Sequence, residues 1–199
     1  MLIDLHTHTY PKSGCSNLKP EELILLSKQA GLDAVCLTEH DTLWEVAKAE
    51  ELAREYDLIV LRGMEITTEI GHVLVFGLNH RGANYSHVRE LREAVTKAGA
   101  VMILAHPFRV SYTMNCKDEV KQLFDAMEGI NGTDLDHQNA ATQMMCEELG
   151  MVATAGSDCH AASECGSCGT YFEKWITSEE ELIAEVKAGR CRPVDLRHR

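Results

Sequence analysis

Two short segments of this sequence place metal-binding side chains two residues apart. They are His6-Thr7-His8 and Asp158-Cys159-His160. On an extended segment, residues two apart project to the same face, so both side chains of a pair can approach one ion. Imidazole and carboxylate groups together suit zinc, manganese or iron, and a carboxylate can also bridge two ions. The two segments therefore predict a transition-metal site.

Further histidines and carboxylates occur along the chain between these two segments. Several lie at the end of a predicted apolar strand or within one. A lone histidine is most often an ordinary polar residue, and His80, His87 and His137 are expected to be solvated. The other histidines differ from these three because they recur at the ends of successive strands, which favours a metal-binding role. The predicted metal ligands are His6, His8, His40, Glu65, His72, His106, Asp158 and His160.

The elements that must position these residues follow from the alternation of apolar and amphipathic segments. Strands are expected at 2–5, 34–37, 58–61, 64–67, 73–76, 101–104, 127–130 and 151–155. Helices are expected at 20–30, 43–56, 88–98, 119–126, 138–149 and 179–187. This alternation is typical of a parallel sheet covered by helices, whose strands all open onto one face. Side chains that are far apart in the sequence are therefore expected to converge at that face.

The leading architecture is a single α/β domain over residues 1–199, built as a closed or distorted (β/α) barrel. The chain is short for eight strand–helix units, which typically need about 250 residues, so seven units fit better. An open doubly wound sheet is the alternative. Its nucleotide-binding form usually carries a glycine-rich first turn, whereas here the first turn contains His6-Thr7-His8.

The composition of the chain disfavours nucleic acid and membranes as binding partners. The net charge of −12 disfavours a long nucleic-acid groove, which needs clustered lysine and arginine. The sequence has neither a signal peptide pattern nor an apolar run long enough to span a membrane, so a cytoplasmic location without membrane contact is expected. The eight cysteines are then expected to be reduced, with Cys165 and Cys168 in a flexible loop. The oligomeric state cannot be predicted from the sequence.

Five segments occur in an order that resembles the PHP (polymerase and histidinol phosphatase) superfamily. They are Asp4-Leu5-His6-Thr7-His8-Thr9, Thr38-Glu39-His40-Asp41, Gly63-Met64-Glu65-Ile66, Ala105-His106-Pro107 and Gly156-Ser157-Asp158-Cys159-His160. The resemblance extends from about residue 2 to residue 172. It is specific for the superfamily and says little about the substrate. It implies a distorted (β/α)7 TIM-like barrel with two or three divalent ions of manganese, iron or zinc.

The resemblance also assigns residues to ions. His6, His8, Glu65 and Asp158 are expected to hold the first ion, and Glu65 is expected to bridge to a second ion held by His72 and His106. His40 and His160 are expected to hold a third ion. The family usually adds an acidic residue or histidine a few positions after the first histidine pair. The segment 10–16 has neither, so either Cys15 replaces that ligand or the third site is weak.

The function that these residues and the resemblance imply is metal-dependent phosphoester hydrolysis, with Glu65 and Asp158 as catalytic metal ligands. Arg109, three residues after His106, is expected to hold a phosphate oxygen in a fork, unless it is an ordinary surface arginine. The expected substrate is a small phosphomonoester, a nucleotide phosphate or a short nucleic-acid end, so both a phosphatase and a 5′-3′ exonuclease are open. A non-catalytic metal-binding scaffold also stays open, as does metal-dependent hydrolysis of an amide or ring.

Overall fold

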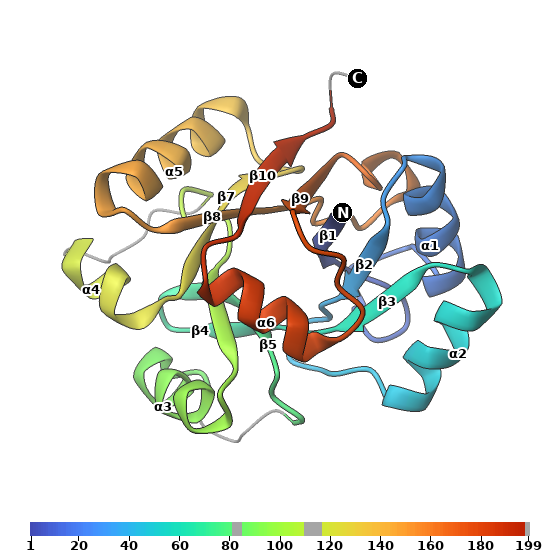
Figure 1. The fold of residues 1–199 in the computed structure, drawn as a ribbon, viewed down its shortest axis with the longest axis horizontal. Helices are drawn as coiled ribbons and strands as arrows, with labels where there is room; N and C mark the ends of the chain where they lie inside the picture. The colour runs from blue at the N-terminus through green and yellow to red at the C-terminus, as the bar shows by residue number, and fades with distance from the viewer. Residues whose placement is uncertain (81–84, 110–116, 198–199) are drawn as a thin grey trace.

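A computed structural model describes residues 1–80, 85–109 and 117–197 of the chain (Figure 1). The strands are β1 (Leu2–Thr7), β2 (Ala34–Leu37), β3 (Ile59–Arg62), β4 (Met64–Thr68), β5 (Gly71–Phe76), β6 (Val101–Leu104), β7 (Ala126–Asn131), β8 (Val152–Gly156), β9 (Cys168–Phe172) and β10 (Cys191–Asp195). The helices are α1 (Pro20–Gln29), α2 (Val46–Tyr56), α3 (Val88–Ala98), α4 (Lys117–Leu123), α5 (Asp136–Leu149) and α6 (Glu179–Lys187), with a short 3-10 helix, η1, at Ala162–Glu164.

The described strands form two five-stranded sheets within one α/β domain. The first sheet has the order β10-β9-β1-β2-β3, and the second has the order β4-β5-β6-β7-β8. Two isolated parallel bridges, Thr7 to Cys159 and His40 to Glu65, link the sheets at one end. The sheets do not form one continuous ladder, so closure into a (β/α)7 barrel stays a prediction.

The strands are not all parallel, contrary to the sequence-based expectation. β1, β2 and β3 are parallel, as are β6, β7 and β8. However, β5 is antiparallel to both β4 and β6, and β9 is antiparallel to both β1 and β10. The chain between β4 and β5 is too short to hold a crossover helix, so β5 must return in the opposite direction.

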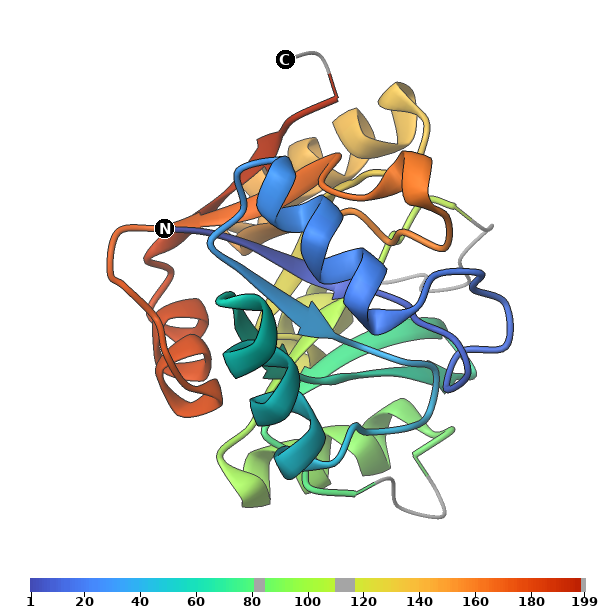
Figure 2. The same ribbon diagram turned by 90° about the vertical axis from the view of Figure 1, so that its right-hand side faces the viewer.

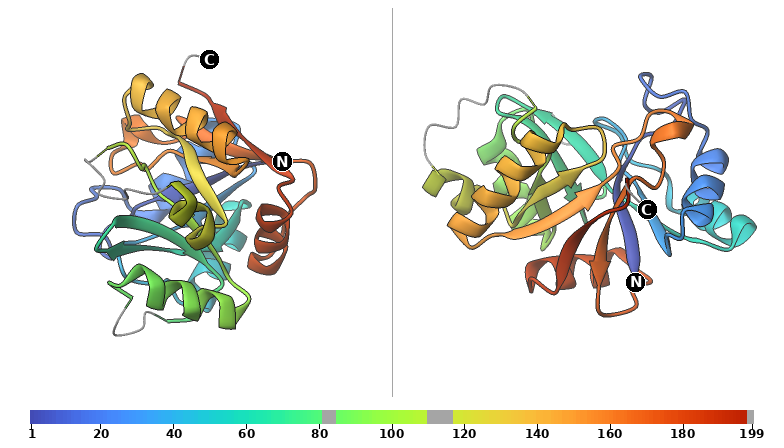
Figure 3. Two further views of the ribbon diagram at one scale, coloured as in Figure 1. Left: turned by 90° about the vertical axis from the view of Figure 1, so that its left-hand side faces the viewer. Right: turned by 90° about the horizontal axis from the view of Figure 1, so that it is seen from above.

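Alternating side chains along the strands divide most of the apolar core of the described residues into three large clusters, beside a small fourth one. In β2, Val35 and Leu37 pack with residues of α1 and α2, whereas Ala34 and Cys36 join a central cluster to which both sheets contribute. β5 and β6 alternate in the same way between the central cluster and the side covered by α3. Figures 1 and 2 show α1 and α2 beside the first sheet, and Figure 3 shows α3, α4 and α5 beside the second.

Two glycines lie where the chain passes closely between the sheets. Gly63 separates β3 from β4, so the chain leaves the first sheet and enters the second at this residue. A Cβ on Gly63 would lie 2.6 Å from Cε1 of the buried Phe76. A Cβ on Gly156, at the end of β8, would lie 2.4 Å from Cβ of His6. Larger residues at either position would force the two sheets apart.

The last two strands were not predicted from the sequence. β9 and β10 contain Cys, Gly, Thr, Arg and Pro rather than an apolar run, yet β9 pairs with β1. Cys168 is fully buried as the first residue of β9, so its predicted place in a flexible loop is wrong. The described cysteines carry no disulfide, while Cys116 lies outside the described residues. Within the described ranges, no helix has the length and apolar character needed to span a membrane.

Candidate metal centre

The eight predicted metal ligands converge where the ends of the two sheets meet. They are His6 in β1 and His8 after it, His40 after β2, Glu65 in β4, His72 in β5, His106 after β6, and Asp158 and His160 after β8. His72 and Glu65 are each the second residue of their strand, whereas the other six lie near or after the end of a strand. Because β5 is antiparallel to its neighbours, its beginning lies at the same end as the carboxyl ends of the parallel strands.

Five imidazoles surround the carboxylate of Glu65, which is 1% exposed. The nitrogen-to-oxygen distances are 3.3 Å for His6, 3.1 Å for His8, 2.9 Å for His40, 2.8 Å for His72 and 3.0 Å for His106. Burial alone would raise the pKa of Glu65, but His6 and the neighbouring rings hold the pKa well below its ordinary value. The carboxylate is therefore ionised, and each of its oxygens faces a different set of rings.

Asp158 completes the buried part of the centre. Its Oδ1 lies 3.3 Å from Nε2 of both His6 and His8, and 3.7 Å from Nδ1 of His160. Burial would raise the pKa of Asp158, yet His6 and His8 hold the pKa well below its usual range. Both Asp158 and His106 have positive φ angles, +53° and +29°, which non-glycine residues rarely adopt. Such strain is typical of residues whose position serves a site.

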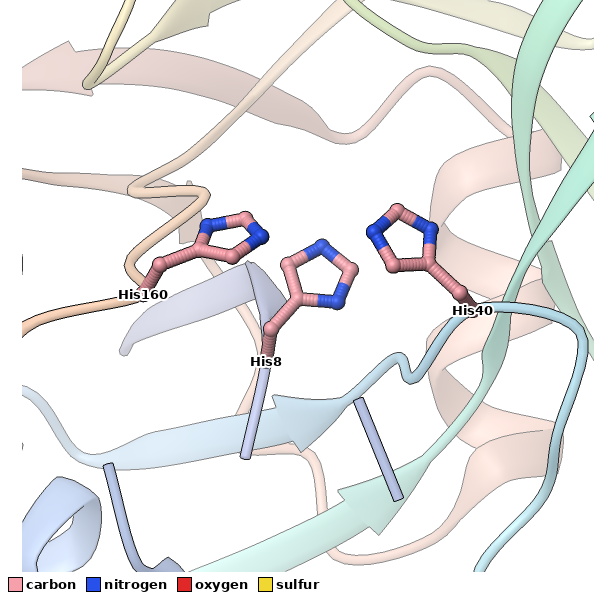
Figure 4. A group of neighbouring side chains, drawn as sticks. All are labelled: His8, His40 and His160. Carbon is pink, nitrogen blue, oxygen red and sulfur yellow. The ribbon is translucent and has the colours of Figure 1, made fainter. Parts of the chain in front are cut away.

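Four overlapping groups of side chains in the described residues can each hold an ion. They are His6, His8 and Asp158; His6, Glu65 and His106; His40, Glu65 and His72; and His8, His40 and His160. Figure 4 shows the last group, in which the ring of His8 lies between those of His40 and His160. The arrangement is consistent with a centre of several metal ions.

Some contacts in the centre fit shared ligands of a metal ion. Ligand atoms that each lie about 2.0–2.2 Å from a tetrahedral ion are roughly 3.3–3.6 Å apart. Oδ1 of Asp158 lies at such a distance from Nε2 of His6 and of His8. Nδ1 of His40 and Oε2 of Glu65 lie 2.9 Å apart, yet neither atom has a hydrogen-bond partner. Buried polar atoms are rarely left unpaired, so these two atoms suit a cation between them.

Outer side chains fix two of the rings. From the sequence, Glu128 could be either a partner of a ligand or a support of the core, and Ser13 was not assigned a role. Nδ1 of His6 lies 2.8 Å from Oε1 of the buried Glu128, and Nδ1 of His8 lies 3.2 Å from Oγ of Ser13. Ser13 in turn donates to the buried Glu39. The carboxylate of Glu128 accepts from His6, and the hydroxyl of Ser13, which donates to Glu39, can accept from His8, so both rings hold a proton on Nδ1 and direct Nε2 toward the centre. Glu128 ends an apolar segment, which was the available signal for it.

Among the described residues, three rings of the centre are partly exposed to solvent. His6 and His8 are fully buried and the side chain of His106 is 5% exposed, whereas the side chains of His40, His72 and His160 are 28%, 34% and 29% exposed. Burial and the neighbouring His8 lower the pKa of His160, so its ring is neutral, as a metal ligand must be. A substrate can reach the centre on the side of these three exposed rings.

Arg109 lies at the centre but is turned toward protein groups. Its Nη1 lies 2.7 Å from Oδ2 of Asp158 and its Nε lies 2.7 Å from Oδ1 of Asp134. Nη2 donates to Asn131 and Thr133 at 2.8 and 2.7 Å. These contacts exclude an ordinary surface arginine on a loop, while phosphate binding by Arg109 stays a prediction.

Cys15 is not part of the centre in the described residues. It is exposed, and none of the four groups of possible ligands includes it. Burial and the carboxylates of Glu65, Glu39 and Asp158 raise the pKa of its thiol, which disfavours the thiolate. Glu39 does not supply the missing ligand either, because it accepts hydrogen bonds from Thr9, Ser13 and Trp44.

Known proteins that resemble this chain include phosphoester-cleaving enzymes. A probable phosphatase of Photobacterium profundum is 25% identical over 223 residues, covering 93% of this chain and 85% of that protein. The 5′-3′ exoribonuclease Rnm of Escherichia coli is 35% identical over 83 residues, which span 40% of this chain and 28% of the exoribonuclease.

The fold is also found among solved structures. The crystal structure of a metal-dependent phosphoesterase candidate from Bifidobacterium adolescentis aligns with a TM-score of 0.68, covering 99% of this chain and 98% of that chain at 17% identity. A profile of a PHP-associated region matches residues 136–191. A profile of the PHP domain matches residues 4–155, a range that holds every clustered ligand except Asp158 and His160. This match covers most of the chain, and the protein therefore belongs to the PHP domain family.

Proposed function

We propose that this protein is a hydrolase that cleaves small phosphoesters with two or three divalent ions of manganese, iron or zinc. The observation that carries the proposal is the ionised, buried Glu65 with five imidazole nitrogens within 3.3 Å of its oxygens. When bound, the ions supply Lewis acids for the phosphoryl oxygens and water acidic enough to ionise near neutral pH.

The residues of the chain hold and orient the reactants. Glu65 would be a ligand common to the first and second ions and would neutralise part of their charge. Asp158 and the buried rings of His6 and His8 would hold the first ion. The partly exposed rings of His40, His72 and His160 would leave room for a phosphoryl group beside the ions. Arg109 attracts the anion and, through Oδ2 of Asp158, steadies that ligand.

A nucleic-acid end is the second candidate substrate, because the chain shares a 35% identical segment with an exoribonuclease. That segment is short relative to both proteins, and the net charge of −12 disfavours a long polyanion. We therefore place a small phosphomonoester or a nucleotide phosphate first and a short 5′ end second. A non-catalytic scaffold would bind metal without turning over any of these.

The test combines metal analysis with a substrate panel. Metal-free protein is loaded separately with manganese, iron and zinc, then assayed with p-nitrophenyl phosphate, a nucleoside monophosphate and a 5′-phosphorylated oligonucleotide. We expect hydrolysis that a chelator abolishes. Glu65→Gln should lower turnover by orders of magnitude because it removes the charge between the ions, whereas Glu51→Gln, on the exposed face of α2, should not.

Two results would contradict this proposal. Metal-loaded protein without activity on any substrate of the panel would favour a scaffold. Near-native activity of Glu65→Gln, with its fold verified by circular dichroism, would exclude the bridging role of Glu65.

A further inference from the structure

The side chain of Asn131, at the end of β7, joins two carboxylates of the metal centre. It is fully buried. Its Nδ2 lies 2.9 Å from Oε2 of Glu128 and 3.3 Å from Oδ2 of Asp158. Its Oδ1 accepts from Nη2 of Arg109 at 2.8 Å and from the backbone amide of Thr133 at 2.9 Å. Because these last two partners only donate, the amide has one possible orientation.

In each of the two carboxylates, one oxygen faces histidine rings of the centre and the other oxygen faces the amide of Asn131. Oδ1 of Asp158 faces Nε2 of His6 and His8, while Oδ2 faces Asn131 and Arg109. Oε1 of Glu128 lies 2.8 Å from Nδ1 of His6, while Oε2 accepts from Asn131. The two carboxylates can therefore rotate only if the hydrogen bonds of Asn131 break.

A local irregularity in β7 makes this arrangement possible. In a regular strand, residues three apart point to opposite faces. The pairing of β7 with β8 shifts between Glu128 and Ile130, so Gly129 is an extra residue and Asn131 turns to the face of Glu128. A Cβ on Gly129 would lie 3.0 Å from Cβ of Ala153, so the bulge has little room for a side chain. Asn139 of α5 then holds the backbone of Asn131 through two hydrogen bonds.

We propose that Asn131 is a positioning residue that sets the geometry of the first metal site. Through Glu128 it keeps a proton of His6 on Nδ1, which leaves Nε2 as the atom that can bind an ion. Through Asp158 it keeps Oδ1 directed at the same position as that Nε2. One buried amide thereby couples an imidazole and a carboxylate that would bind the same ion, so the inference rests on the metal-binding part of the proposed function.

The main variant is Asn131→Leu, which removes both donors at similar volume. Titration of manganese or zinc into metal-free protein should show binding to the first site weakened by about 10- to 100-fold. Nitrogen NMR of metal-free protein, at a pH where the ring of His6 is neutral, should show that ring changing from one tautomer to a mixture of two. Glu128→Gln combined with Asn131→Leu should cost less affinity than the two single changes added together, because both act on His6.

Asn139→Ala is the matched control, because it removes support from the backbone of Asn131 and leaves the amide in place. It should lower the unfolding temperature with a clearly smaller loss of metal affinity. If Asn131→Leu does not fold, Asn131→Ser provides the same test, since a short hydroxyl cannot reach both carboxylates.

Two results would overturn the inference. One is metal affinity of the folded Asn131 variant within about threefold of wild type, well under the loss expected of a residue that orients ligands. The other is an unchanged tautomer of His6. If wild-type protein binds no metal, the proposed function fails instead, and the NMR measurement still tests Asn131.

Discussion

At the scale of single residues, the buried charges of the centre stabilise one another. Burial lowers the pKa of His6, but Asp158, Glu128 and Glu65 around the ring outweigh burial and raise its pKa well above 6.5. In the metal-free protein at neutral pH the ring is therefore a cation among carboxylates. A metal ion that binds the centre must displace the proton on Nε2.

The raised pKa of His6 predicts how metal-free protein responds to pH. A group whose pKa is higher in the folded state contributes stability that is complete below its unfolded value, about 6.5, and is lost as pH rises through the folded value. The free energy of unfolding of metal-free protein should thus fall as pH rises above about 7. Urea denaturation at several pH values measures this, and His6→Gln should flatten the profile. A flat profile for wild type would contradict the assigned charge of His6.

The group made only of histidines predicts unequal metal binding. His8, His40 and His160 are all imidazoles, and His8 also faces the first site. With no carboxylate of its own, this group should bind an ion more weakly than the two groups that include Glu65. Titration of zinc into metal-free protein should show about two tight equivalents and a looser third, as the donor count suggests.

Cys15→Ser should leave that titration unchanged, because the thiol is exposed and apart from the four groups. Loss of the third equivalent in this variant would show that the loop carries Cys15 into the centre when metal binds. Three equally tight ions would show that another side chain completes the third site.

At the scale of elements, close contact between β1 and β8 holds the two halves of the centre together. Gly156 at the end of β8 lies against His6, where a Cβ would come within 2.7 Å of the backbone nitrogen of His6. Backbone atoms cannot move aside as a flexible side chain can. The distance between the first and second sheets is therefore fixed by a residue without a side chain.

Gly156→Ala should destabilise the protein by about 1–3 kcal/mol, the usual cost of forcing an extra methyl into packed structure. It should also weaken metal binding, because it displaces His6. Gly14→Ala is the matched control, since a Cβ at Gly14 meets nothing within 4 Å. Chemical denaturation and metal titration of both variants would decide, and equal stability of the two would exclude the contact.

The sequence predicts those elements that have a clear apolar period. Helix 88–98 and strands 34–37 and 101–104 have the predicted bounds because their periods are regular and Gly99 ends the helix. β9 and β10 have no such period, because their place is set by pairing with β1 and with each other. The antiparallel direction of β5 follows from the short turn between β4 and β5. The hydrophobic pattern of the sequence does not indicate strand direction.

At the metal centre, too, the sequence predicts some residues and not others. Imidazoles and carboxylates at strand ends are visible in the sequence, since few other roles explain their repetition. The segment 128–132 also resembles the family in the sequence, but the role of Asn131 is not visible there, because it depends on the bulge at Gly129 that turns its side chain inward. Arg109 is visible as a charge near His106, but its contacts with Asp134 and Asp158 depend on loops that meet only in the folded protein.

At the scale of the whole molecule, the eight predicted ligands come from both sheets. His6, His8 and His40 belong to strands of the first sheet or to the segments that follow them, and the other five belong likewise to the second sheet. Bound ions would therefore connect the sheets at the end where two bridges already link them. Metal binding should stabilise the entire fold rather than a local loop.

Removing the metal should thus lower the unfolding temperature of the whole protein. A ligand at 100 times its dissociation constant stabilises the folded state by about 2.7 kcal/mol. Calorimetry of metal-loaded and chelated protein measures the difference, and adding metal back should restore it. One transition that shifts as a unit is expected. Two transitions, of which only one responds to metal, would show that the sheets unfold separately.

The pairing of β1 with β9 orders events during synthesis of the chain. His6 and His8 are made before β9, the strand that pairs with β1. They are also made before Asp158 and His160, which complete the groups around His8. Until these later residues have been made, the histidines of β1 have only part of their ligand set, so an ion can be captured with full affinity only afterwards. Metal occupancy would then mark molecules in which β1 and β9 have already paired.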